Sequence, residues 1–296
     1  MTTRGTCVIS FAGTRLAISW EGGASLAVLN ALSLKQSALA AGNGVTSHFR
    51  LISAENDEPV RLYRGDHLLY RGQSEGAAAG ILLDCAVNDL ADGCRIGPMF
   101  HAAAVSCCGH GILLPGESGS GKTTLAAWLA SKGWDYLSDE IACIEQGSME
   151  VQAFYRSLHL RLPIAPPLAQ LIPAAETCGD SPAGPRLYSG PQGVIVPIEL
   201  IHPHSIYHTP ELQMIVFPHY VPDADGEFIR LSQAQACARM MGLTVNVRNL
   251  PGHGLAEISR LARRVPAYAF IYGRLDHLAD KMAALLDRHL PLRRAR

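Results

Sequence analysis

The fold of this chain follows from one stretch, Gly116-Glu117-Ser118-Gly119-Ser120-Gly121-Lys122-Thr123. The stretch fits G-x-x-x-x-G-K-[ST] at every fixed position, which is the Walker A pattern of a phosphate-binding loop. Glycines let the backbone approach oxygen atoms closely, and successive N–H groups then form a concave anion site. Such a loop joins a strand to a helix, and the apolar residues 111–114 and the helix-forming residues 123–129 flank it accordingly. The sequence therefore predicts a P-loop on an α/β sheet.

The chemistry of such a loop indicates two ligands, ATP and Mg²⁺. Lys122 is expected to reach the β- and γ-phosphates and to act in catalysis, and Thr123 offers its hydroxyl to Mg²⁺. The start of the following helix adds its positive dipole end. The residues predicted to bind the nucleotide are Gly116, Glu117, Ser118, Gly119, Ser120, Gly121, Lys122, Thr123, Thr124 and Arg156.

An acidic pair, Asp139-Glu140, follows the expected strand 135–138. A carboxylate at the end of a strand beside a phosphate loop binds Mg²⁺ or orients the nucleophile. In a kinase one of the two accepts the proton of the acceptor hydroxyl, and in an NTPase one orients water. The alternative is two solvated charges at a turn. We predict catalytic roles for both residues, which divide metal binding and orientation of the nucleophile between them.

Two further residues have open interpretations. His101 lies near the start of the strand expected at 99–107, where it is either a core histidine or a catalytic group beside the transferred phosphate. Arg156 either clamps phosphate charge or is a surface arginine. Both are included in the predicted site.

The chain of 296 residues is long enough for one large domain and a smaller one. We predict an α+β domain over 1–95 and a P-loop kinase domain over 96–296. Short strands and a helix at 74–90 fill the first part, and a further helix is expected at 24–41. The Pro-, Gly- and Ala-rich stretch 163–191 is predicted to be a flexible loop or lid. Helices are also expected from 232 to 241, at 255–264 and at 275–289.

Bulk composition excludes several classes of protein. The net charge is −1 and 17% of residues are charged, so neither a nucleic acid nor a membrane surface is an expected partner. The most apolar run, 76–87, is interrupted by Asp84 and is shorter than the roughly 20 residues that span a bilayer. No signal-peptide pattern is found at the N-terminus. We therefore expect a cytoplasmic protein.

His101, the loop and the pair Asp139-Glu140 together resemble the catalytic domain of the bacterial HPr serine kinase family. The segment "HAAAV…GILLPGESGSGKTTLAAWL…YLSDE" is similar to the HPr-kinase-related proteins, some of which phosphorylate the C-terminal serine of lasso-peptide precursors. The resemblance covers residues 99–145. It implies a phosphoenolpyruvate carboxykinase-like mixed sheet that carries the P-loop, with Asp139 as the general base and His101 near the γ-phosphate. It also implies that Glu140 supports that base or binds Mg²⁺ beside Thr123. It also implies a homo-oligomer.

The chain departs from the family at three points. Glu140 stands where HPr kinases usually have Asp, the signature E-[IV]-R-G-x-G is absent, and the N-terminal region differs. HPr is therefore not the expected acceptor, and the favoured partner is a peptide or small protein with an acceptor serine. Two alternatives stay open: a small-molecule kinase acting on free serine, and a nucleotide-binding regulatory module without turnover.

Overall fold

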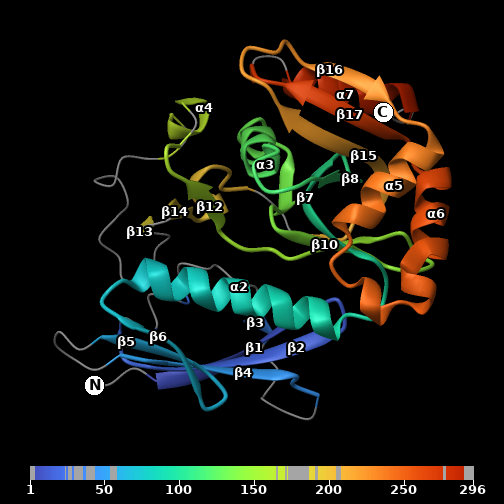
Figure 1. Cartoon of the computed structure of the whole chain (residues 1–296). Helices are drawn as coiled ribbons and strands as arrows, with labels where there is room; N and C mark the ends of the chain where they lie inside the picture. The colour runs from blue at the N-terminus through green and yellow to red at the C-terminus, as the bar shows by residue number, and fades with distance from the viewer. Residues whose placement is uncertain are drawn as a thin grey trace.

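The protein is an α/β structure with three sheets, two of which contain both parallel and antiparallel pairs (Figure 1). Its computed structural model describes residues 4–23, 25, 29, 36–37, 44–53, 59–164, 166–170, 172, 187–190, 193–204, 208–275 and 278–289. Over these residues no helix combines the length and the apolar character needed to cross a membrane.

A six-stranded sheet is formed by the first quarter of the chain, in the order β3-β1-β2-β4-β5-β6. All its pairs are antiparallel except β2 with β4. The strands are β1 (Arg4–Phe11), β2 (Thr14–Glu21), β3 (Gln36–Ser37), β4 (Ser47–Ile52), β5 (Val60–Arg64) and β6 (His67–Gly72).

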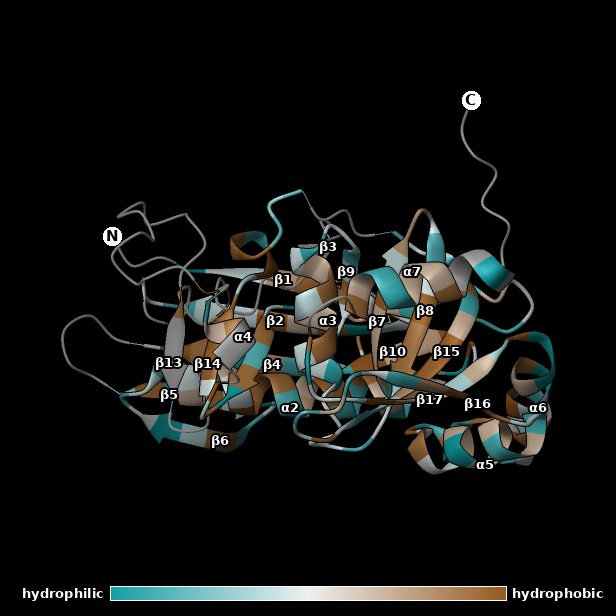
Figure 2. Ribbon diagram, turned by 90° about the horizontal axis from the view of Figure 1, so that it is seen from above, coloured by the Kyte–Doolittle hydropathy of each residue, from teal (hydrophilic) through white to brown (hydrophobic). Residues whose placement is uncertain are grey.

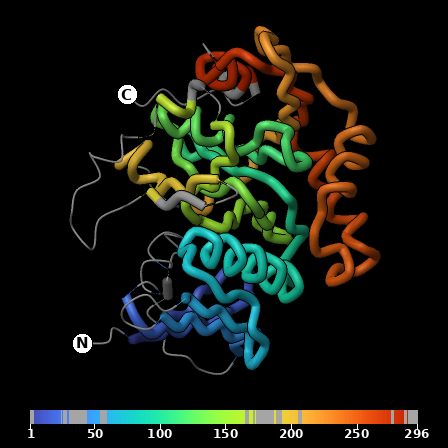
Figure 3. The backbone as a smooth tube through the Cα atoms, turned by 60° about the vertical axis from the view of Figure 1, so that its left-hand side comes forward, coloured from blue at the N-terminus to red at the C-terminus, as the bar shows by residue number. Residues whose placement is uncertain are grey.

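Helix α2 (Glu75–Gly93) lies between this sheet and the rest of the molecule, as Figures 1 and 3 both show. Ser74 begins the helix, because its hydroxyl accepts a hydrogen bond from the backbone N–H of Ala77 at 3.1 Å. At the other end, the Asn249 side chain donates to the carbonyl oxygens of Ala91 and Asp92. These bonds satisfy carbonyls that a helix end otherwise leaves without partners. A distant part of the chain thus fixes where α2 ends.

The second sheet carries the predicted phosphate loop, which connects one of its strands to helix α3. Its order is β11-β10-β7-β8-β15-β17-β16, with β9 paired to β7. β15 pairs in parallel with β8 and β17, while the other pairs are antiparallel. The strands are β7 (Met99–Cys107), β8 (His110–Pro115), β9 (Asp135–Ser138), β10 (Ile141–Ile144), β11 (Val151–Ala153), β15 (Glu211–Tyr220), β16 (Glu227–Arg230) and β17 (Ala267–Tyr272). Apolar residues run along β8, β10 and β15 (Figure 2).

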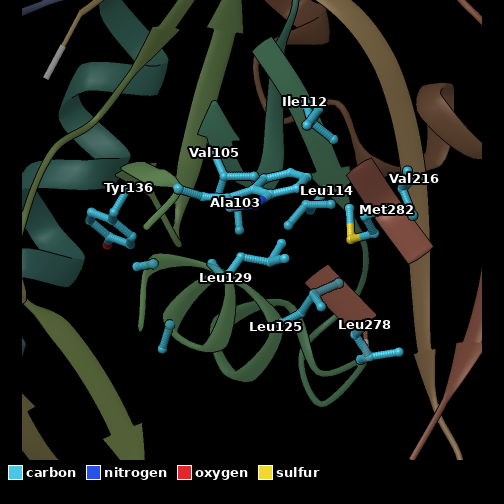
Figure 4. Close-up of a cluster of buried hydrophobic side chains, with 14 of the residues drawn as sticks. Ala103, Val105, Ile112, Leu114, Leu125, Leu129, Tyr136, Val216, Leu278 and Met282 are labelled. Atoms are coloured by element: carbon cyan, nitrogen blue, oxygen red, sulfur yellow. The ribbon is translucent and has the colours of Figure 1, made fainter. Parts of the chain in front are cut away.

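Helix α3 (Lys122–Ser131) packs on this sheet. Leu125 and Leu129 face the strand residues Ala103 and Leu114 in one buried cluster, which Met282 of α7 (Leu278–His289) closes (Figure 4). Helices α5 (Gln233–Leu243) and α6 (Leu255–Arg264) lie at one side of the sheet, and short 3₁₀ turns η2 (Ile198–Leu200), η3 (Val247–Asn249) and η4 (Pro251–Gly254) join neighbouring elements. The α3 packing fixes the direction in which the helix start points.

Strands β7 and β8 form a hairpin that leads into the loop, with antiparallel pairing from Ala102 with Pro115 to Cys107 with His110. The helix expected from 232 is α5, and a capping box of Ser232 and Gln235 begins it. The helix expected over 24–41 is wrong at Gln36–Ser37, which form β3 beside β1; most of that range lies outside the described residues. The last helix begins at Leu278 and not at Leu275, whose side chain is buried before the helix starts.

A third sheet was not expected from the sequence. β12 (Leu158–Arg161) and β13 (Tyr188–Gly190) both pair with β14 (Gly193–Val196). The predicted flexible segment 163–191 falls mostly outside the described residues. Its described part includes the short helix α4 (Pro166–Ala169) and β13, so it is not loop throughout.

Candidate active site

The loop leaves β8 and enters α3 at Gly121, which has φ +93°. A side chain at Gly121 is excluded twice, because this φ favours glycine and because a Cβ atom would collide with the hydroxyl of Tyr272. That hydroxyl donates a 2.7 Å hydrogen bond to the Gly121 carbonyl. The backbone N–H of Tyr220 donates to the Ser120 carbonyl at 3.2 Å. The ends of β15 and β17 therefore hold the loop in place.

Lys122 is the first residue of α3 and is buried. Its ammonium donates hydrogen bonds to the carbonyl oxygens of Gly116 at 2.7 Å and Glu117 at 2.8 Å. Burial lowers the pKa of Lys122 to about 8, while Glu140 and Asp139 oppose that shift. The lysine is thus charged at neutral pH and held against the loop by bonds that a phosphate oxygen can replace.

Asp139 follows β9 and its carboxylate is fully buried. Oδ1 accepts a hydrogen bond from the Tyr136 hydroxyl at 2.8 Å and lies 3.1 Å from Nη2 of Arg156. Among the described residues, Oδ2 has no hydrogen-bond partner. Burial raises the pKa of Asp139, and Arg156, Tyr136 and Thr123 oppose that rise. A buried carboxylate whose pKa is raised is suited to accept a proton.

Arg156 lies between β11 and β12, and the surface alternative for it is wrong. Its side chain is only 3% exposed, and Nη2 donates to Oε2 of Glu140 at 2.7 Å while also facing Asp139. Burial alone lowers the pKa of the guanidinium, but Asp139 and Glu140 raise it above its ordinary value. Arg156 therefore ties the two carboxylates of the acidic pair together, which excludes two freely solvated charges at a turn.

His101 of β7 is partly exposed, with 30% of its side chain accessible, so it is not a fully buried core histidine. Its Nε2 lies 3.8 Å from Oε1 of Glu140. Burial lowers the pKa of His101, and the positive charge of Lys122 lowers it further. The ring is therefore neutral at pH 7, and its contact with Glu140 is polar, without a full ion pair.

A cavity of about 610 Å³ joins these groups. Most of the predicted site residues line it, namely His101, Ser118, Gly119, Gly121, Lys122, Thr123, Thr124, Asp139, Glu140 and Arg156. Gly116, Glu117 and Ser120 do not line it; they contribute backbone carbonyls that hold Lys122 and the β15 end. The loop and the acidic pair, which are separated by 15 residues in the chain, thus share one cavity.

The cavity also has a wall that the sequence did not indicate. Asp84 of α2 lines it, together with His159 and Arg161 of β12. The available signal was the alternation Leu158-His159-Leu160-Arg161, in which the two leucines are buried and the polar pair is not. No sequence pattern indicated Asp84, because its position at the cavity depends on the tertiary packing of α2.

The donor set fits a magnesium ion. Thr123 and Glu140 offer a hydroxyl and a carboxylate in the same cavity, and 36% of the Glu140 side chain is exposed. Mg²⁺ prefers such oxygen ligands and is commonly held by one or two carboxylates plus substrate phosphates.

Comparison with known proteins gives little further. No protein-family model matches the chain, and no curated protein matches its sequence. Among solved structures, the chain is similar to the Hpr(Ser) kinase/phosphatase from Coxiella burnetii, with 12% sequence identity over 64% of this chain and 95% of that chain, and a TM-score of 0.31. At that TM-score the likeness bears on neither activity nor substrate, so the candidate site rests on its own geometry.

Proposed function

We propose that this chain is an ATP-dependent serine kinase that transfers the γ-phosphate to a serine hydroxyl of a peptide or small protein. One observation carries the proposal: Lys122 of the phosphate loop and the buried carboxylate Asp139 line one cavity. Phosphoryl transfer needs positioning and charge neutralisation more than covalent chemistry. The family resemblance adds a specific acceptor, the C-terminal serine of a lasso-peptide precursor.

In the proposed reaction the serine oxygen attacks the γ-phosphorus and the bond from that phosphorus to the β–γ bridging oxygen breaks. ADP leaves with the electron pair of that bond, and the hydroxyl proton passes to Oδ2 of Asp139. Lys122 leaves its loop carbonyls to hold phosphate oxygens. Arg156 and Tyr136 keep Oδ1 of Asp139 fixed, so that Oδ2 is the oxygen presented to the acceptor. Thr123 and Glu140 would hold Mg²⁺, which supplies charge neutralisation on the phosphates.

The variant Asp139→Asn separates a kinase from a regulatory nucleotide-binding module. Asparagine keeps the size of the side chain but cannot take up the proton, so we expect phosphotransfer to fall by about 10²–10⁴-fold. The Kd for Mg·ATP, measured by calorimetric titration, should change little. Transfer by the variant at the rate of the unaltered protein would contradict the role of Asp139 as base. Tyr136→Phe is the matched companion, since it removes only the hydrogen bond to Oδ1 and should cost less.

A further inference from the structure

We propose that Arg161 is the arginine that contacts the γ-phosphate of ATP and neutralises its charge during transfer. The inference rests on the proposed function, since it assigns a further catalytic residue to that same reaction. It differs from the sequence prediction, which selected Arg156 for the phosphate.

Arg156 is occupied by other groups. Its Nη2 contacts both Asp139 and Glu140, and its Nη1 donates to the carbonyl oxygen of Ser157 at 2.9 Å. The residue is buried, so any move toward a phosphate would leave two carboxylates without their cation in a desolvated place. That cost makes Arg156 a structural cation of the acidic pair and an unsuitable phosphate ligand.

Arg161 is in the opposite situation. It ends β12, is exposed, and lines the cavity. In the part of the chain that the structure describes, its guanidinium forms no hydrogen bond and no ion pair. Leu158 and Leu160 of the strand are buried, whereas the alternating His159 and Arg161 are not, and both of these polar residues line the cavity together with Leu160. An arginine with five free donors thus faces the cavity that the loop opens into.

Its position relative to the loop supports a phosphate contact. Arg161 lines the same cavity as Lys122, the lysine that is expected to hold the phosphates. His101 and Asp84 of α2 line that cavity as well. Arg161 therefore borders the space that the proposal assigns to the end of a loop-bound triphosphate.

The charge balance of the cavity favours such a residue. Three carboxylates line it, those of Asp84, Asp139 and Glu140. Among the described lining residues, Arg161 adds a third cationic side chain to Lys122 and Arg156, which reduces the excess of negative groups that a phosphate chain would face. A guanidinium also matches two phosphate oxygens at once, which an ammonium does not.

The test compares Mg·ATP and Mg·ADP binding by calorimetric titration in the full-length chain. In Arg161→Ala we expect the Kd for ATP to rise about tenfold and the Kd for ADP to stay within about twofold, because only ATP carries the contacted phosphate. Arg161→Lys should fall between the two proteins. Arg71→Ala is the matched control, since Arg71 is an exposed arginine on β6 outside the cavity.

The kinetic arm measures the loss of kcat in Arg161→Ala and its recovery by added guanidinium ion, which a merely structural role would not give. Equal losses of ATP and ADP affinity, or no loss, would overturn the assignment of Arg161 while leaving the kinase intact. A normal ATP-over-ADP difference in the unaltered protein with no acceptor phosphorylated would instead overturn the proposed function alone. Failure of the unaltered protein to bind ATP would overturn both.

Discussion

At the scale of single residues, the role that we assign to each charged side chain in the site follows from its burial and from the groups that it contacts. Lys122 and Asp139 are both buried, and burial moves the pKa of each toward neutrality, down for the lysine and up for the carboxylate. The positive charge of Arg156 offsets the mutual repulsion of the two carboxylates of the acidic pair. Under the proposed function, these shifts keep a cation for the phosphates and a base for the hydroxyl in one desolvated place.

Nucleotide affinity should therefore depend on pH above neutrality. Under the proposed function Lys122 binds phosphate as a cation. With a pKa of about 8, its charged fraction in the free protein falls from about nine-tenths at pH 7 to about one-tenth at pH 9. We expect the Kd for Mg·ATP to rise over that interval. Lys122→Arg stays charged throughout, so its Kd should be flat in the same titration. An identical rise in both proteins would contradict the assignment to Lys122.

At the scale of elements, the cavity is lined by residues of helix α2, from the first third of the chain, and by the loop that precedes α3. Gly80 of α2 lines the cavity, and a Cβ atom there would meet nothing within 4 Å. Because the position is helical and open, a larger side chain can be placed there without straining the helix. The α2 face is therefore a place where cavity volume can be reduced without replacing a charged group.

The variant Gly80→Leu should fill part of the cavity. We expect phosphotransfer at saturating ATP to fall about tenfold or more, while the helix itself gains stability because leucine is the better helix former by roughly 0.5–1 kcal/mol. Gly242→Leu is the control, since Gly242 lies in α5, is equally open, and does not line the cavity. Equal transfer rates in the two variants, measured with the same acceptor, would show that α2 forms no part of the working site.

The elements around the loop could be predicted from sequence because their signals are local. The hairpin β7-β8, the loop and α3 are contiguous, and the acidic pair follows directly on β9. The third sheet could not be predicted, because β12 has only four residues and pairs with β14 more than 30 residues away. Arg161 is the last residue of β12 and was not predicted as a site residue for the same reason. Arg156 was found as a residue but given an open role, since its burial depends on tertiary packing.

At the scale of the whole molecule, the N-terminal sheet and the loop-bearing sheet share one hydrophobic cluster. Phe11, Leu51 and Leu82 belong to it together with Ile141 and Phe154 from beyond residue 95. The rings of Phe11 and Phe154 lie 5.4 Å apart at 57°. The predicted division into 1–95 and 96–296 stays a prediction, and the shared cluster indicates that the two parts unfold together.

We therefore expect a single cooperative transition in calorimetric unfolding. Phe154→Ala should lower the free energy of unfolding by about 3–5 kcal/mol and should shift the whole transition, because the cavity it leaves is common to both parts. Phe154→Leu, which keeps most of the volume, should shift it less. Two separate transitions, of which the variant moves one, would contradict the shared core.

The central claim, that this chain is a serine kinase, is tested most directly by mass spectrometry of acceptors incubated with the pure protein and Mg·ATP. The acceptors are peptides ending in serine, including lasso-peptide precursors, the same peptides with serine replaced by alanine, free serine, and HPr. The account predicts one added phosphate on a peptide serine, absent from the alanine peptides and from reactions with Asp139→Asn. Phosphate only on free serine would contradict the peptide acceptor, and no phosphate on any acceptor despite ATP binding would contradict the kinase.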